Sequence, residues 1–163
     1  MSKSEDMRKM IDKVKNFKQF VNENVDNNLQ NIISNVGKRY SKEHNKTPQQ
    51  LNSGDCEDIA YDVIELMGGE TPNTFIMDDG WFWSTEKISK YKTKTSEYWN
   101  VDNLIEYGEP HFDWKNLNKL DLNGHVWVYS YGKHYDVETI NGVDNFWKLP
   151  IYQRQLTNLG LKH

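Results

Sequence analysis

Cysteine and long apolar runs are the scarcest features of this chain of 163 residues. The single cysteine, Cys56, excludes an intramolecular disulfide and favours a reducing compartment. No apolar stretch approaches the ~18 residues of a membrane-spanning helix, and no apolar signal segment opens the chain. These absences predict a cytoplasmic protein without a membrane partner.

The charge pattern excludes another class of partner. The net charge is −4 and no block of like charges occurs, so a basic face for nucleic acid is not expected. Short metal-ligand pairs of the Cys-x-x-Cys or His-x-x-x-His type are missing, and we expect neither a metal nor a cofactor. Six Trp and nine Tyr favour a folded protein, and the length fits one domain over residues 1–163.

The first part of the chain predicts a helical segment over residues 1–40. Apolar residues recur there at three- and four-residue spacing, which is typical of an amphipathic helix. Residues 26–28 are Asp-Asn-Asn, poor helix formers, so the pattern fits either one helix or two. We expect this segment to pack on its own domain, with a partner-binding arm as the alternative. The apolar positions are Met7, Met10, Ile11, Val14, Phe17, Val21, Val25, Leu29, Ile32, Ile33 and Val36.

Residues 48–156 form the predicted core of the domain. A helix is expected from about 55 to 67, with Ser53 or Asp55 as its cap and two glycines at its end. Strands are expected at 74–77 and 80–84, and residues 124–140 predict a β-hairpin. Helices followed by an antiparallel sheet indicate an α+β fold.

Cys56 is the candidate nucleophile, because it opens the predicted helix at 55–67. Backbone N–H groups and the helix dipole at that end stabilise a thiolate. Asp55, Glu57 and Asp58 oppose this unless their side chains point away. Activation of the thiol is therefore expected to come mainly from a histidine, and His125 on the predicted hairpin is the candidate.

The hairpin register ranks two acids as partners of His125. If residues 131–132 form the turn, His125 pairs directly with Glu138 and lies diagonal to Asp136, on the same face. A three-residue loop would move Asp136 to the other face. Glu138 is therefore the first candidate to orient His125, and Asp136 is the second.

Gln50 is the candidate side chain for stabilising an oxyanion, with Gln49 as the alternative. An amide close to the nucleophile can donate to the oxyanion together with the Cys56 backbone N–H. Trp81, Trp83 and Trp127 can wall a substrate cleft, although tryptophans in a small domain mostly belong to the core.

These segments resemble the papain-like and transglutaminase-like cysteine hydrolases. The resemblance covers about residues 48–68 and 122–150 and rests on short motifs in the order nucleophile helix, histidine strand, turn and acid strand. The family usually has Asp where this chain has Glu138, and the spacing of Gln50 to Cys56 is similar to that of papain-like enzymes. The motifs are Gly54-Asp55-Cys56-Glu57-Asp58-Ile59-Ala60, His125-Val126-Trp127-Val128, Gly132-Lys133 and Tyr135-Asp136-Val137-Glu138.

The resemblance implies a thiol-dependent hydrolase or acyl transferase that acts on an amide, peptide or isopeptide bond. A small phage or bacterial member of this type is expected, located in the host cytoplasm or the virion if phage-encoded. Its expected partner is a peptide or protein substrate, and the oligomeric state is left open. Because the family includes members that have lost activity, the alternative is an inactive binding or virion-associated module on the same fold.

Overall fold

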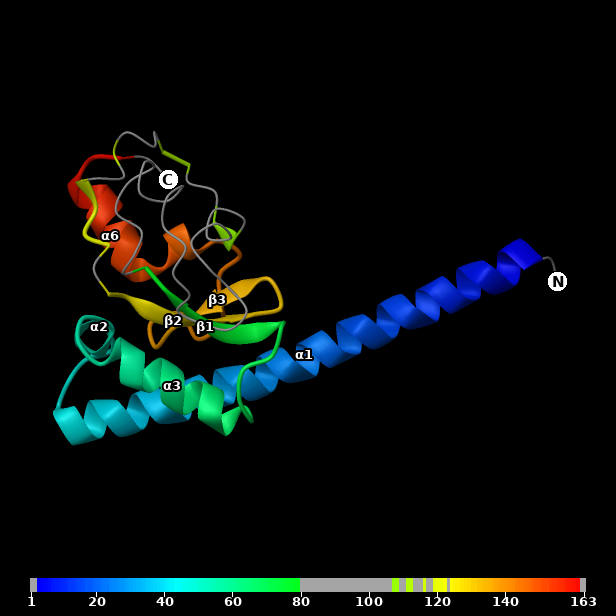
Figure 1. Ribbon diagram of the computed structural model, residues 1–163, viewed down its shortest axis with the longest axis horizontal. Helices are drawn as coiled ribbons and strands as arrows, with labels where there is room; N and C mark the ends of the chain where they lie inside the picture. The colour runs from blue at the N-terminus through cyan, green and yellow to red at the C-terminus, as the bar shows by residue number, and fades with distance from the viewer. Residues whose placement is uncertain are drawn as a thin grey trace.

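The computed structural model describes residues 3–79, 107–108, 111–112, 116, 119–122 and 124–161. Figure 1 shows a body built around a small sheet, from which one long helix projects. In chain order the elements are α1 (Lys3–His44), α2 (Pro48–Asn52), α3 (Cys56–Leu66), β1 (Thr74–Asp78), β2 (Val126–Ser130), β3 (Lys133–Tyr135), the 3-10 helix η2 (Phe146–Lys148) and α6 (Pro150–Asn158).

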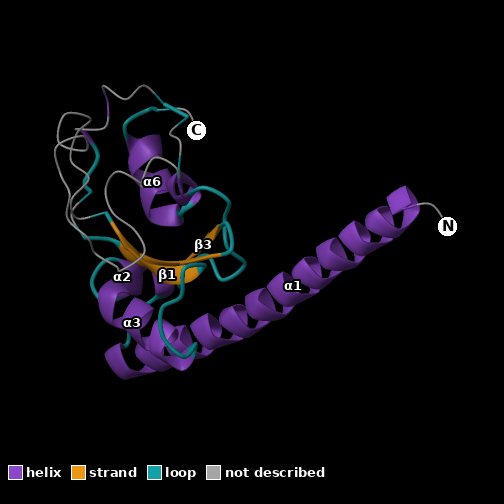
Figure 2. Ribbon diagram, turned by 45° about the vertical axis from the view of Figure 1, so that its right-hand side comes forward, coloured by secondary structure: helices purple, strands orange, loops and turns teal. Residues whose placement is uncertain are grey.

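The three strands form an antiparallel sheet in the order β1-β2-β3. Figure 2 shows the sheet between two layers, with α1 and α3 on one face and α6 on the other. Each face carries its own apolar core, because side chains alternate across the pleat of every strand. The α+β fold predicted from the sequence is confirmed at this level.

The hairpin turn has the conformation that its residues favour. Tyr131 and Gly132 have φ angles of 45° and 87°, both positive, as a tight two-residue hairpin turn requires. Ser130 pairs with Lys133, which confirms the expected register at the turn. The ladder ends at the pair of Val128 and Tyr135, and the chain then turns away. The direct pairing expected for Glu138 is therefore wrong, because β3 stops before that residue.

Helix α1 is continuous from Lys3 to His44, so the single-helix alternative holds. Asp26, in the stretch of poor helix formers, accepts hydrogen bonds from Lys133 (2.7 Å) and Tyr135 (2.9 Å). These tertiary contacts offset the weak local propensity of the stretch. Among the described residues, no helix combines the length and the apolar character that crossing a membrane requires.

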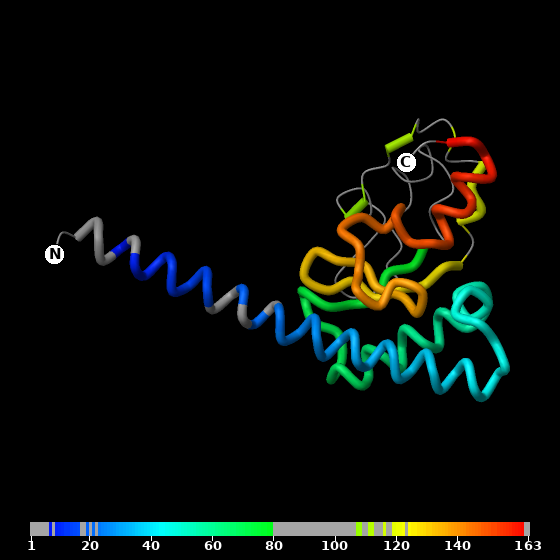
Figure 3. Tube along the Cα trace, turned by 180° about the vertical axis from the view of Figure 1, so that it is seen from behind, coloured from blue at the N-terminus to red at the C-terminus, as the bar shows by residue number. Residues whose placement is uncertain are grey.

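Only the second half of α1 packs on the body, as the trace in Figure 3 also shows. Leu29, Ile33 and Val36 are buried against α3 and the sheet, as expected for packing on its own domain. Met7 and Met10, on the same apolar stripe, are instead exposed. At the described apolar positions of the first half, Met7, Met10, Ile11 and Val14, the pattern therefore forms a helix without forming a core.

Helix α3 follows the prediction closely. It begins at Cys56 with Asp55 as the N-cap residue, and Gly68 and Gly69 follow its end with positive φ angles that suit glycine. Its apolar face packs on β2 and α1. The nucleophile candidate thus sits at the first helical position, fixed by the packing of the whole helix.

The opposite face of the sheet is covered by the C-terminal segment. Trp127 on β2 stacks on Phe146, and Tyr152 on α6 packs edge-on against both rings. The C-terminal segment thus packs across this face of the sheet. The strand expected at 80–84 lies outside the described residues, as do Trp81 and Trp83, whereas Trp127 belongs to the core.

Two substitutions test whether the second half of α1 packs on the body while its first half projects. Ile33→Ala should destabilise the protein by about 2–5 kcal/mol, because it leaves a cavity in a packed core. Met10→Ala should change stability by less than about 0.5 kcal/mol, because the side chain is exposed. Urea denaturation of both variants measures the difference, and equal losses would contradict a projecting first half of α1.

Candidate active site

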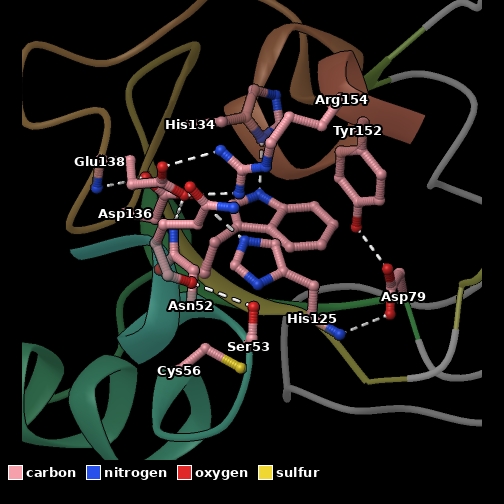
Figure 4. A network of polar contacts seen from close by, with 12 residues as sticks. Asn52, Ser53, Cys56, Asp79, His125, His134, Asp136, Glu138, Tyr152 and Arg154 are labelled. Carbon is pink, nitrogen blue, oxygen red and sulfur yellow. Dashed lines mark hydrogen bonds and ion pairs between the residues drawn. The ribbon is translucent and has the colours of Figure 1, made fainter. Parts of the chain in front are cut away.

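The start of α3 and the two ends of the β2–β3 hairpin meet at one end of the sheet. They are the first residue of α3, the residue before β2 and the residue after β3, which carry Cys56, His125 and Asp136. Figure 4 shows the imidazole of His125 between the thiol and the carboxylates. All three residues are buried, Cys56 being 7 % exposed, so their mutual interactions occur largely away from water.

The pair of His125 and Asp136 is the best-defined contact of the site. Nε2 of His125 lies 3.2 Å from Oδ2 of Asp136, and the two side chains are only 2 % and 3 % exposed. A carboxylate accepts hydrogen bonds, so Nε2 carries a proton and donates it. In the neutral ring the free lone pair then lies on Nδ1, which is the nitrogen available to act as a base.

The surroundings of His125 favour its charged form. Burial by itself lowers the pKa of His125, but the hydrogen bond to Asp136 and the nearby Cys56 thiol raise it to about 10. An opposite charge at hydrogen-bond distance outweighs desolvation here because it lies in the same low-dielectric region. The site is therefore built to hold an imidazolium, which is the partner that a thiolate needs.

The thiol of Cys56 has two acceptors within reach. In this conformation its S–H donates to the carbonyl oxygen of Gly124 at 3.4 Å. Nδ1 of His125 is buried and has no hydrogen-bond partner among the described residues, although Cys56 is close enough to affect the His125 pKa. Nδ1 is the ring nitrogen that does not contact Asp136, so it is the second acceptor available to the thiol.

The three acids that flank Cys56 are either paired or exposed to water, which reduces their expected opposition to a thiolate. Asp55 accepts from Lys46 at 2.6 Å and contacts Nδ1 of His44 at 3.0 Å. The hydrogen bond from Lys46 is the main reason why the pKa of Asp55 is lowered. Glu57 and Asp58 are exposed, so water screens their charges from the buried sulfur.

Glu138, the first-ranked orienter, is held elsewhere. Its carboxylate accepts two parallel hydrogen bonds from Arg154, at 2.8 and 2.9 Å, and a third from Asn52 at 2.9 Å. Its backbone N–H donates to Oδ1 of Asp136 at 2.9 Å. The order of the two acids is therefore reversed: Asp136 contacts His125, and Glu138 braces the turn that carries Asp136.

Gln50 also has a different role from the one expected. Its side-chain oxygen accepts the backbone N–H of Thr47 at 2.9 Å, and Thr47 in turn accepts from the Gln50 backbone. This reciprocal pair caps α2, and Gln50 is exposed. No described contact joins its side chain to Cys56, so the structure gives the predicted oxyanion donor a capping role. Asn52, two residues later, lines the small apolar cavity beside Cys56 instead.

Several residues of the site carried little or no signal in the sequence. Asp79 and Arg154 contact the site from segments that the motifs do not include. An acid directly after a strand is a weak signal for a buried carboxylate, and Asp79 fits it. His134 is close by but serves the core: its Nδ1 accepts from Trp127 at 2.9 Å, and burial lowers its pKa to about 4.

Comparison with known protein families, curated proteins and solved structures gave no match. The described residues contain no cluster of His, Cys, Asp or Glu suited to a metal ion.

The two acids can be separated by titrating His125. Asp136→Asn should lower the pKa of His125 by several units, because burial then acts without the opposing carboxylate. Glu138→Gln should leave it within about one unit, because Glu138 acts on Asp136 and not on the ring. The Hε1 proton resonance of His125 measures both, and a larger effect of Glu138→Gln would restore the original ranking.

The same pair predicts a pH dependence of stability. The folded-state pKa of His125, about 10, lies above its ordinary value of 6.5, so its stabilising charge is complete below ~6.5. That stabilisation is lost as the pH rises through 10. Urea unfolding between pH 6.5 and 9.5 should show falling stability in the wild type and a flatter profile in Asp136→Asn. Parallel profiles would mean that the pair is not charged.

Proposed function

We propose that this protein is a thiol-dependent hydrolase or acyl transferase acting on an amide, peptide or isopeptide bond. Cys56 is the nucleophile, His125 the base and acid, and Asp136 the residue that orients His125. One observation carries the proposal: each nitrogen of a single buried imidazole faces one of the two groups that nucleophilic catalysis requires.

The first step forms the acyl-enzyme. Nδ1 of His125 takes the Cys56 proton, the sulfur attacks the carbonyl carbon, and the new C–S bond replaces one C–O π bond. When the tetrahedral intermediate collapses, the C–N bond breaks and the imidazolium gives its proton to the leaving nitrogen. Asp136 keeps the Nε2–H in place throughout and stabilises the positive ring.

The start of α3 supplies the electrostatic part of the site. Cys56 is the first residue of this helix, and the first N–H groups of a helix have no intrahelical acceptor. These N–H groups lie at the positive end of the helix dipole. In the proposed mechanism they face the substrate oxygen on which negative charge develops. The Cys56 backbone N–H is the proposed oxyanion donor, without a contribution from Gln50.

The second step decides between hydrolysis and transfer. Either water or an amine attacks the thioester, Nδ1 of His125 accepts its proton, and the proton returns to sulfur as the C–S bond breaks. The order of the segments supports a papain-like or transglutaminase-like arrangement. The helix that bears Cys56 packs on β2, and His125 directly precedes that strand.

One observation favours the inactive alternative. Cys56 is 7 % exposed, and its thiol is bonded to a backbone carbonyl, as expected of a structural cysteine. A binding module on the same fold needs no reactive thiol. It would retain the pair of His125 and Asp136 only as a buried ion pair within the core.

Acetyl transfer from p-nitrophenyl acetate distinguishes the two. The enzyme should release a burst of one p-nitrophenolate per chain and carry one acetyl group on Cys56, detected by mass spectrometry. His125→Ala should slow acylation about 100- to 10,000-fold, the usual contribution of a general base. Adding a primary amine then shows whether the acyl group passes to amine or to water.

Cys56→Ala is the negative control and should show no burst. Met10→Ala, on the projecting half of α1, is the matched control for the substitution itself and should behave as wild type. Acetylation at lysines alone, with the same rate in Cys56→Ala, would refute the acyl-enzyme and support the binding module.

A further inference from the structure

Asp79 is a buried carboxylate that directly supports the backbone of the site. It follows β1 and is 1 % exposed. Its Oδ1 accepts the backbone N–H groups of both Gly124 and His125, at 2.9 and 2.8 Å, as Figure 4 shows for His125. Its own N–H donates to the carbonyl of His125 at 3.1 Å. Three hydrogen bonds thus join Asp79 to the two residues before β2.

These three hydrogen bonds lie beyond the end of the β1–β2 ladder. The ladder between β1 and β2 ends at the pair of Asp78 and Val126, so Gly124 and His125 lie beyond it. Gly124 has a φ angle of +102°, which glycine adopts at little cost. Because glycine also adopts many other conformations, the backbone here needs further contacts to hold it in place. The carboxylate of Asp79 therefore fixes both acceptors available to the thiol: the Gly124 carbonyl and, through its backbone, His125.

The second oxygen of Asp79 is satisfied by a residue from the opposite layer. Oδ2 accepts the hydroxyl of Tyr152, which is fully buried on α6. Among the described residues no ion pair involves Asp79, and the positive charge that lowers its pKa is that of His125. Because three donors complete its hydrogen bonds, the carboxylate is held rigidly behind the ring.

We propose that Asp79 is a positioning residue of the active site, which orients His125 and Gly124 and places a second negative charge behind the imidazolium. Asp136 holds the ring from Nε2, and Asp79 holds its backbone. The assignment deepens the proposed function and rests on it for its catalytic meaning. The effect of Asp79 on the protonation of His125 can be tested without measuring turnover.

The charge of Asp79 argues for a functional role. Burial raises the pKa of Asp79 to about 6, against the hydrogen bond from Tyr152, the charge of His125 and the two backbone donors. Since the folded-state pKa lies above the ordinary value of 3.8, ionisation of Asp79 lowers stability as the pH rises through 6. An asparagine oxygen could accept the same two N–H groups without that cost. A carboxylate at this position is explained if its charge serves His125.

Asp79→Asn tests the charge while preserving the shape. In the chain of 163 residues, with Cys56 intact and again in the Cys56→Ala background, the His125 pKa should fall by about one unit, measured from its Hε1 resonance. Alkylation of Cys56 by iodoacetamide at pH 7 should slow by at most about tenfold, because one unit changes the ratio of ion pair to neutral pair tenfold. Thermal stability at pH 7 should be equal to or above wild type.

Asp26→Asn is the matched control, because Asp26 also accepts a tyrosine hydroxyl in a tertiary contact, but on the α1 face of the sheet. It should lower stability and leave the His125 pKa and the alkylation profile unchanged.

Tyr152→Phe tests Asp79 without replacing it. Losing the hydroxyl donor raises the Asp79 pKa further, so alkylation of Cys56 should slow near pH 7 and recover by pH 8.

The outcomes separate the two proposals. An unchanged His125 pKa in Asp79→Asn overturns the positioning role, whatever the activity of the enzyme. A lowered His125 pKa in the Cys56→Ala background, together with no acyl-enzyme in the wild type, supports the positioning role and rejects the catalytic function. If Asp79→Asn does not fold, Tyr152→Phe decides: an alkylation profile that is unchanged at pH 7 overturns the proposal.

Discussion

The structure of this site depends on a charged histidine that is kept out of water. His125 is almost fully buried, and burial alone would leave its ring neutral. The Asp136 carboxylate reverses that preference, and the surrounding groups are arranged to keep the two in contact. Glu138 and Arg154 hold the turn that carries Asp136, while Asp79 and Tyr152 hold the backbone that carries His125. A buried charge of this kind is costly to build and is typical of functional sites.

The fold brings these groups together through both of its cores. Helix α3 is fixed against α1 and the sheet, which places Cys56 at one end of β2. Helix α6 and η2 cover the other face and supply Tyr152 and Arg154. The site therefore lies where the two layers meet at the sheet end, and loss of either layer would disturb it. The projecting half of α1 contributes nothing described to the site, and only its second half supports α3.

Much of this arrangement follows from the sequence, for reasons that differ from residue to residue. The α+β fold, the helix that begins at Cys56 and the Tyr131-Gly132 turn follow from periodicity, glycine positions and turn chemistry, which are local. The choice between Asp136 and Glu138 was missed because extrapolating the ladder ignores where a strand ends. Gln50 was misassigned because its spacing to Cys56 does not reveal that it caps α2. Asp79 and Arg154 were not found, since their contacts with the site join segments that are distant in sequence.

The measurement that tests the central claim most directly is the ultraviolet absorbance of the Cys56 thiolate as a function of pH, taken as the difference between wild type and Cys56→Ala. Thiolate absorbance should be present at pH 7 in the wild type, because His125 is held as an imidazolium, and it should disappear when His125 is replaced by Ala. A wild type without thiolate absorbance at pH 7, or the same absorbance in His125→Ala, would contradict a functional Cys56–His125 pair.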